Sequence, residues 1–455
     1  MIMNVLSLTP LKRWGRALLI SVPVLAAQAV VPALLQPYTD QALMSVAQAQ
    51  ETKQEKKQEK KKQKTKRTQA MNNKVYKKLQ EAQEAVEEKD IEGALEILSD
   101  LKNGKRPLND AEMANVLNMD AFIYYTKEDY PGALNAYSRI LTLPEAPEGT
   151  VIQARFSVAQ LYFVIEDYAN GVKALLEWFE FTEAPTASAY MLLSQGYYQL
   201  KEYDKSLKNV EIAINLYKEK GKVPKENWYG LQRFLYYDKE NYRKVVEILR
   251  EMLVHYPKKQ YWMQLSGMYS ELKDESQQLH AMETAYVQGM LDKEKELVNM
   301  ASLFLLNEVP YKAAKVLDKG IKEKVIEPTS KNLELLGNSW RQAQEVKKAI
   351  PEIAKAAAKS DKGNLWTRLC SVYLDNDQYK KAVNACDKGL KKGGVKRVDN
   401  AYLVKGMAHY NLKQYKSARS AFIKAAKDKR SKKYAQDWLK FMDRELARQK
   451  SLEQV

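Results

Sequence analysis

The chain has 455 residues, 45% of them hydrophobic, which is enough for several globular domains or one long repeat array. Its three histidines and two cysteines are too few for the usual zinc sites, so we expect no metal ion and no cofactor. The net charge of +17 would by itself suggest nucleic acid, but it is split into −9 over residues 71–310 and +18 over residues 311–455. This split favours two surfaces for two protein partners, and we expect no nucleic-acid partner.

Residues 1–49 have the order of residues that is typical of a secretory signal. Three basic residues at positions 12–16 precede a nearly uncharged stretch over residues 17–35, and Ala47-Gln48-Ala49 offers a small-x-small cleavage site. The stretch of 19 residues is also long enough to span a bilayer, so an uncleaved inner-membrane anchor is the alternative. In both cases the basic residues hold the N-terminus in the cytoplasm. We therefore expect the rest of the chain to lie in the bacterial periplasm.

Residues 50–70 are predicted to be a disordered linker rich in lysine and glutamine. Residues 51–68 contain no apolar side chain and cannot contribute to a core. The alternative is an electrostatic tether to an anionic membrane surface, where each basic group contributes about 1 kcal/mol.

A repeated pattern fills the chain from residue 71 to residue 449. Its clearest copy has Trp366, Leu369, Cys370 and Tyr373 on one predicted helix, then Tyr379 and Ala382 at the start of a second. The small residue that opens the second helix recurs every 33 to 39 residues. Its ten positions are Ala94, Ala133, Gly171, Ser206, Val245, Gln278, Ala313, Ala349, Ala382 and Ala418.

The pattern resembles the tetratricopeptide repeat (TPR), whose unit has about 34 residues. The resemblance implies an all-α, right-handed superhelical solenoid of about ten helical hairpins. Each hairpin would leave one face unburied until the next stacks on it. Residues 432–449 are predicted to form a solvent-facing capping helix. Its apolar stripe would be Tyr434, Trp438, Phe441, Met442 and Leu446.

Residues suited to catalysis are not grouped in the sequence. We find no glycine-rich phosphate loop, no G-x-S-x-G pattern and no histidine pair with metal-ligand spacing, and the repeats leave no segment for a catalytic domain. We therefore expect a protein that is not an enzyme. Cys370 and Cys386 fall on the two helices of one predicted hairpin. They would form a disulfide in an oxidising compartment, or remain two buried thiols.

Aromatic residues in the second to fifth repeats suggest a binding groove. In TPR arrays the first helices line a concave groove, and the frame places six aromatic residues there. They are Phe122, Tyr125, Phe163, Tyr198, Phe234 and Tyr237. Aromatic side chains are favoured anchors at protein interfaces, so we expect a peptide of a partner protein to bind them. The alternative is that these rings pack against the helices of the next repeat.

Short strings within the repeats, beyond the generic repeat pattern, suggest a narrower resemblance. They include Leu176-Glu177-Trp178-Phe179 and Pro310-Tyr311-Lys312-Ala313-Ala314. Together with the export signal, they resemble the TPR proteins encoded beside TonB/ExbB/ExbD energy-transduction genes of proteobacteria. The resemblance implies a periplasmic scaffold that serves TonB-driven uptake. An assembly factor for pili, secretion or outer-membrane proteins is the alternative.

Overall fold

The computed structural model describes residues 70–453, so the predicted signal segment and nearly all of the linker lie outside the described residues. The described residues form 21 helices and no strand. The helices are α3 (Asn73–Glu87), α4 (Ile91–Lys102), α5 (Asp110–Thr126), α6 (Tyr130–Ile140), α7 (Glu148–Val164), α8 (Tyr168–Phe181), α9 (Ala187–Gln199), α10 (Tyr203–Glu219), α11 (Glu226–Asp238), α12 (Tyr242–His255), α13 (Lys259–Glu271), α14 (Glu275–Val287), α15 (Glu294–Leu306), α16 (Pro310–Lys322), α17 (Ser330–Gln342), α18 (Val346–Lys359), α19 (Asn364–Asp375), α20 (Tyr379–Lys392), α21 (Val398–Asn411), α22 (Tyr415–Ala425) and α23 (Lys429–Glu453). Within this part of the chain, no helix is both long enough and apolar enough to cross a membrane.

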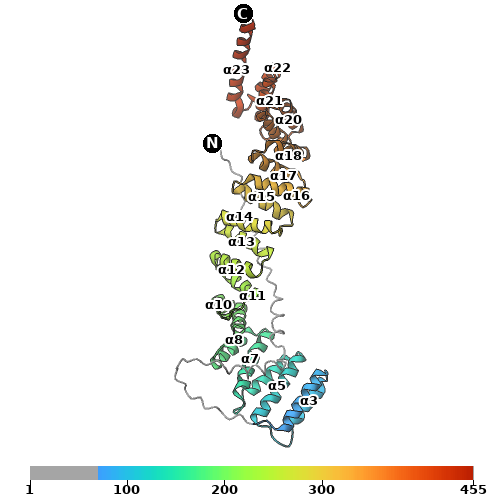
Figure 1. Cartoon of the computed structure of the whole chain (residues 1–455), viewed down its shortest axis with the longest axis vertical. Coiled ribbons are helices and arrows are strands. Elements are labelled where there is room, and N and C mark those ends of the chain that lie inside the picture. Colours follow the sequence, from blue (N-terminus) through green and yellow to red (C-terminus); the bar gives the residue numbers. More distant parts are fainter. Residues whose placement is uncertain (1–69, 454–455) are drawn as a thin grey trace, which may run out of the picture. The chain divides into compact units, whose positions relative to one another are not determined.

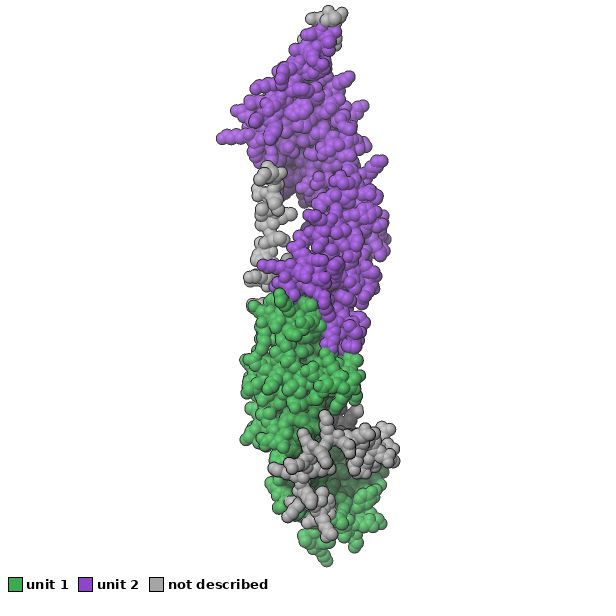
Figure 2. Space-filling view, turned by 60° about the vertical axis from the view of Figure 1, so that its left-hand side comes forward, with its two compact units in different colours: residues 1–248 green, residues 249–455 purple. Residues whose placement is uncertain are grey.

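The chain divides into two compact units, the first ending at Ile248 and the second beginning at Leu249 within α12 (Figure 2). In both units a helix packs mainly on its neighbours in the sequence (Figure 1). Ten consecutive pairs of helices, from α3/α4 to α21/α22, are each joined by a short turn, and we call these pairs hairpins. The last helix, α23, packs on the tenth pair. This confirms the predicted all-α array of about ten hairpins with a helix at its C-terminal end.

The turn inside each hairpin has the same length and backbone conformation throughout. Three residues separate the first helix from the second in every hairpin, and the middle one has a φ between 55° and 68°. This left-handed residue is never glycine. The ten are Lys89, Glu128, Glu166, Lys201, Glu240, Lys273, Glu308, Gln344, Asp377 and Lys413. In contrast, the segment between one hairpin and the next varies from three to seven residues.

The predicted small residues lie where the two helices of each hairpin approach. Each is the fourth residue of its second helix, and nine of the ten are buried, while Gln278 is partly buried. Glycines on the first helices permit the same closeness. A Cβ at Gly337 would lie 2.5 Å from Ile353, and one at Gly406 would lie 2.5 Å from the Phe422 ring. Larger side chains at these positions would therefore push the helices apart.

A pair of hydrogen-bonded serines closes the hairpin of α9 and α10. The Ser194 hydroxyl donates to the Ser206 carbonyl at 2.7 Å, and the Ser206 hydroxyl donates to the Ser194 carbonyl at 2.8 Å. Both side chains are fully buried. Because each hydroxyl has a partner, these polar groups occupy the core without an unsatisfied donor.

Buried carboxylates fasten the two ends of the array. At the start, Glu112 accepts hydrogen bonds from the backbone amides of Asn72 (2.9 Å) and Asn109 (3.0 Å) and pairs with Arg106 at 2.7 Å. Burial raises the pKa of Glu112, but these hydrogen bonds outweigh it, and the pKa lies below its ordinary value. At the other end, Asp399 of α21 accepts a hydrogen bond from Ser431 of α23 at 2.7 Å.

The stripe predicted for the last helix is partly wrong. The Trp438 ring stacks on Phe422 with centroids 5.4 Å apart, and Met442 is fully buried, as expected. Tyr434, however, is 64% exposed, and the buried residue beside it is Ala435. The reason is that α23 lies close to α22, so a small side chain faces the core at that level.

Candidate functional site

The six aromatic residues predicted to line a groove lie on the first helices of hairpins two to five. Phe122 and Tyr125 belong to α5, Phe163 to α7, Tyr198 to α9, and Phe234 and Tyr237 to α11. Five of the six are partly buried, and Phe163 is buried. Being on successive helices does not by itself place these side chains on one surface. Their ring contacts show which of them lie next to one another.

Four of the six rings pack on the tyrosine that opens the second helix of the same hairpin. The centroid distances are 5.6 Å for Tyr125–Tyr130, 6.0 Å for Phe163–Tyr168, 5.7 Å for Tyr198–Tyr203 and 5.8 Å for Tyr237–Tyr242. Hairpin ten repeats the pair with Tyr410 and Tyr415 at 5.8 Å. Each pair spans five residues across the turn, so the first function of these rings is to close the hairpin.

Phe163 does not fit the predicted groove. Its side chain is only 8% exposed. A Cβ at Gly171 of α8 would lie 2.9 Å from the ring, and one at Gly196 of α9 would lie 2.8 Å from it. The ring therefore fills the space that these two glycines leave, and Phe163 is a core residue of hairpins three and four.

Among the six predicted residues, as far as the structure describes them, a ring contact from one hairpin to the next forms only between hairpins four and five. The Tyr198 ring contacts Tyr203 in its own hairpin and Phe234 of the next, with the Phe234 centroid 5.7 Å away in an edge-to-face geometry. Tyr237 follows Phe234 by three residues on α11, which places the two on the same side of the helix. We call Tyr198, Tyr203, Phe234, Tyr237 and Tyr242 the α9–α12 aromatic surface. All five are partly buried.

Two tyrosines at this surface, Tyr198 and its neighbour Tyr236, have a raised pKa. Burial, followed by Tyr203 and Asp238, raises the pKa of Tyr198. Burial and a hydrogen bond to Glu211 raise the pKa of the neighbouring Tyr236 to about 12. A neutral phenol has an apolar ring and a hydroxyl donor, which suits an interface that is partly wet.

Phe122 and Tyr125 lie apart from the α9–α12 aromatic surface. The Tyr125 ring meets Tyr130 in the same hairpin, and neither α5 residue contacts a ring of α9 or α11 among the described residues. The spacing of five residues between Tyr198 and Tyr203 was a signal in the sequence for the closing pair. The contact between Tyr198 and Phe234 had no such signal, because it depends on how two hairpins stack.

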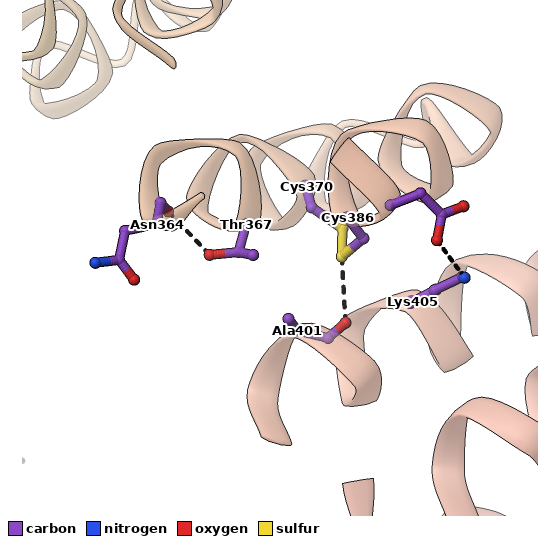
Figure 3. The surroundings of a disulfide bond; sticks show 7 residues. Asn364, Thr367, Cys370, Cys386, Ala401 and Lys405 are labelled. Atoms are coloured by element: carbon purple, nitrogen blue, oxygen red, sulfur yellow. Dashed lines mark hydrogen bonds and ion pairs between the residues drawn. A yellow bond between two sulfur atoms is a disulfide. The ribbon is translucent and has the colours of Figure 1, made fainter. Parts of the chain in front are cut away.

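The structure joins Cys370 and Cys386 in a disulfide within the hairpin of α19 and α20 (Figure 3). The two Cα atoms are 5.2 Å apart, and both side chains are fully buried. The Cys386 sulfur also lies 3.2 Å from the Ala401 carbonyl oxygen of α21 (Figure 3). A disulfide sulfur has no proton to donate, so this contact becomes a hydrogen bond only when the pair is reduced.

Groups suited to metal binding are not assembled in residues 70–453, where no three histidine, cysteine, aspartate or glutamate side chains could hold an ion together. His409 is buried, and its Nδ1 lies 2.7 Å from the Gln414 side-chain oxygen. That contact explains His409 as a structural residue of hairpin ten.

No protein-family model and no curated protein matches the chain. Among solved structures, it is similar to MamA from Desulfovibrio magneticus at 17% identity, over 42% of this chain and 99% of that chain, with a TM-score of 0.34. It is similar to the TPR2AB domain of yeast Sti1 in a complex with pHSP90 at 14% identity, over 59% and 99%, with a TM-score of 0.32. A tetratricopeptide repeat protein from Parabacteroides merdae matches at 13% identity, over 55% and 94%, with a TM-score of 0.33.

The described chain is a helical-repeat solenoid. This conclusion comes from the ten identical turns and the ten fourth-position residues, which give each hairpin the TPR-like form.

Proposed function

We propose that this solenoid is a scaffold that binds other proteins and works in the periplasm as an accessory of a TonB-type energy-transduction or uptake complex. The α9–α12 aromatic surface carries the proposal, because the contact between Tyr198 and Phe234 makes it continuous across two hairpins. Partly exposed aromatic rings on a rigid scaffold are suited to anchor a partner. The basic-then-apolar order of residues 1–35 supports export, and the strings around Trp178 and Tyr311 support the TonB association.

The charge distribution supports a second contact elsewhere on the scaffold. Residues 311–455 carry a net charge of +18, opposite in sign to residues 71–310. A basic surface of this kind attracts an acidic protein or an anionic membrane. The scaffold would then hold one partner at its aromatic surface and meet another at its basic end.

Photo-crosslinking in cells tests the partner. A photoreactive phenylalanine analogue replaces Tyr198 or Tyr237 of the full chain, and the same analogue at the exposed Tyr434 of α23 is the control. We expect positions 198 and 237 to capture a TonB-, ExbB- or ExbD-type component, and position 434 not to capture it. Capture of a pilus, secretion or outer-membrane assembly component would instead support the alternative function. No capture at positions 198 and 237 would exclude the aromatic surface as a binding site.

A reporter fusion tests the location separately. Residues 1–60 are fused to an enzyme that is active only after export. We expect activity in the periplasm, and a reporter that stays inactive would contradict the periplasmic location. Replacing the three basic residues at positions 12–16 with glutamine should reduce the export.

A further inference from the structure

A polar cavity of about 450 Å³ lies in the second unit, between α20, α21 and α22. Its volume falls within the range of roughly 300–1,000 Å³ that is typical of ligand pockets. The wall consists of three lysines, two serines, a tyrosine, a histidine, an aspartate and an alanine, so only one lining side chain is fully apolar. The cavity shares no residue with the α9–α12 aromatic surface and is independent of the proposed function.

Two residues of α21 in this wall depart from the repeat frame. The first position is apolar and buried in the four preceding hairpins of the second unit, where it holds Leu265, Met300, Leu336 and Leu369. Hairpin ten has Lys405 there, with a side chain that is 21% exposed. The second position holds an aromatic residue in hairpins two to nine, but His409 in hairpin ten. Such a local departure from the pattern of a fold is expected at functional sites.

The cavity wall carries an excess of positive charge that a ligand can reach. Its three lysines and one aspartate give a net charge of +2, with His409 counted as neutral. Asp387 of α20 pairs with Lys405 and so compensates one of the three cations (Figure 3). Lys416 and Lys424 of α22 are both exposed, and neither forms an ion pair with a carboxylate within residues 70–453. Two ammonium groups are therefore available to an anion that enters from solvent.

Accessible hydroxyl groups lie on the same side of α22 as these two lysines. Ser420 is four residues from both Lys416 and Lys424, and Ser417 is three residues before Ser420, so all four side chains lie along one side of the helix. Both serines are exposed, and neither hydroxyl is hydrogen-bonded to another group in the described part of the chain. On α21, the Tyr402 ring lies beside them, with its centre 5.3 Å from the Lys424 ammonium. The wall thus combines cations with free hydroxyl donors.

The ligand that matches this wall is a phosphate monoester. At neutral pH its phosphate carries a charge of roughly −1.5 to −2 and offers three strong acceptor oxygens. Lysine binds phosphate as a point charge, and a serine hydroxyl can donate to a phosphate oxygen. We propose that the cavity of hairpin ten binds the phosphate group of a phosphate monoester.

Isothermal titration calorimetry of the full chain with methyl phosphate tests the proposal. The control ligand is methyl sulfate, which has the same shape but a single charge, and both are titrated at about pH 8, where the phosphate is doubly charged. We expect methyl phosphate to bind one site per chain, and methyl sulfate to bind about tenfold more weakly. No binding at millimolar methyl phosphate, or equal binding of the two ligands, would overturn the proposal.

Hairpin nine offers a matched control for the two unpaired lysines. Lys380 and Lys388 of α20 are exposed and hold the frame positions of Lys416 and Lys424. Lys388 even lies over the ring of Trp366, at 4.8 Å from its centre, as Lys424 lies over Tyr402. The two pairs thus differ mainly in their surroundings, because α19 has the apolar Leu369 where α21 has Lys405.

Two double variants compare these pairs. Lys416→Gln with Lys424→Gln should weaken binding of methyl phosphate about tenfold or more, because each lost ammonium removes a charge-assisted hydrogen bond. Lys380→Gln with Lys388→Gln removes the same charge one hairpin earlier and should leave the affinity unchanged. An equal loss in both double variants would overturn the proposal, because binding would then follow the total charge of the second unit. Unchanged affinity in the first double variant would overturn it as well.

A third variant restores the repeat frame. Lys405→Leu gives hairpin ten the residue of hairpins six, eight and nine, so the helical circular dichroism and the thermal midpoint should be maintained. We expect this variant to bind methyl phosphate about tenfold more weakly, because the partly buried cation is lost. Unchanged binding of methyl phosphate by Lys405→Leu would overturn the proposal.

Vesicles distinguish the source of the phosphate group. Phosphatidylcholine vesicles that contain phosphatidic acid present a phosphate monoester, and vesicles that contain phosphatidylglycerol present a diester. If Lys416→Gln with Lys424→Gln weakens binding to the phosphatidic acid vesicles more than to the phosphatidylglycerol vesicles, the cavity receives a lipid headgroup. If this double variant weakens only the binding of soluble methyl phosphate, the cavity takes a small phosphorylated molecule.

Discussion

The middle residue of each hairpin turn has a charged or amide side chain, although its backbone has the left-handed conformation that favours glycine. Lys201, for example, has a φ of 62°. Its amide donates to the Tyr198 carbonyl at 3.0 Å, and the next amide donates to the Tyr197 carbonyl at 2.8 Å. Both backbone amides therefore have a hydrogen-bond partner. A residue with a Cβ loses roughly 1–2 kcal/mol in this conformation, which the turn tolerates because both amides are satisfied.

Replacing Lys201 with glycine should therefore stabilise the protein. The relief of backbone strain exceeds the extra entropy of glycine in the unfolded chain, for a net gain of about 0.5–1 kcal/mol. The measurement is the midpoint of denaturant unfolding. Gln199→Gly, at the end of α9, is the control and should lower the midpoint, because glycine weakens a regular helix. A lower midpoint for Lys201→Gly as well would show that the lysine side chain itself matters.

At the scale of the element, the attachment of α23 depends on one buried carboxylate. Asp399 pairs with Arg397 at 2.8 Å and accepts a hydrogen bond from Ser431 at 2.7 Å, and its side chain is almost wholly buried. The hydrogen bonds from Arg397 are the largest influence on the pKa of Asp399, and the pKa is held well below its ordinary value.

This low pKa predicts acid sensitivity at the C-terminal end. A carboxyl group whose pKa is lower in the folded state stabilises the fold above its unfolded pKa of about 3.9, and its contribution declines as the pH falls further. Asp399→Asn should therefore lower the thermal midpoint at pH 7, with faster hydrogen exchange in α23. At pH 3 the difference between variant and wild type should be smaller. A difference that does not depend on pH would assign the effect to packing and not to charge.

The disulfide of hairpin nine is a second device at this scale. It closes a segment with a sequence separation of 16 residues, for which loop-entropy arguments give about 3 kcal/mol. Reduction of the disulfide should lower the free energy of unfolding by less than this, about 1–2 kcal/mol. The reason is that the reduced hairpin stays packed and the Cys386 thiol can donate a hydrogen bond to the Ala401 carbonyl.

Mass spectrometry of protein purified from the periplasm should show Cys370 and Cys386 joined. Reduction should lower the unfolding midpoint of the second unit and leave the first unchanged. Two free thiols in the exported protein would contradict both the pairing and its assumed compartment.

At the scale of the whole molecule, packing within each unit is almost entirely between neighbouring helices. The stability of such an array is a sum of terms within hairpins and between neighbouring hairpins. A core substitution should therefore destabilise only the hairpins near it. Phe163→Ala removes a ring that fills the space between Gly171 and Gly196, at a cost of about 3–5 kcal/mol. Hydrogen exchange should rise in hairpins two to five and stay unchanged in hairpins eight to ten. A uniform rise over the chain would mean that the array unfolds as one body.

The hairpins could be predicted from the sequence because their determinants are local. The fourth residue of the second helix and the turn of three residues belong to one stretch of chain, and they recur in the same frame. The prediction that Phe163 lines the groove is wrong because its burial depends on two glycines, one of them in the next hairpin. The prediction that Tyr434 belongs to the apolar stripe of α23 is wrong because the closeness of α23 to α22 decides which side of α23 is buried.

The constant turn and the variable segment between hairpins have a consequence for engineering. Since each turn inside a hairpin has three residues, an insertion there would break the left-handed conformation and separate the paired helices. The connections between hairpins already vary from three to seven residues and tolerate a change of length. The segment of residues 141–147 between α6 and α7 is thus a suitable position for a fluorescent protein or an affinity tag. Whole hairpins could be added or deleted at such connections.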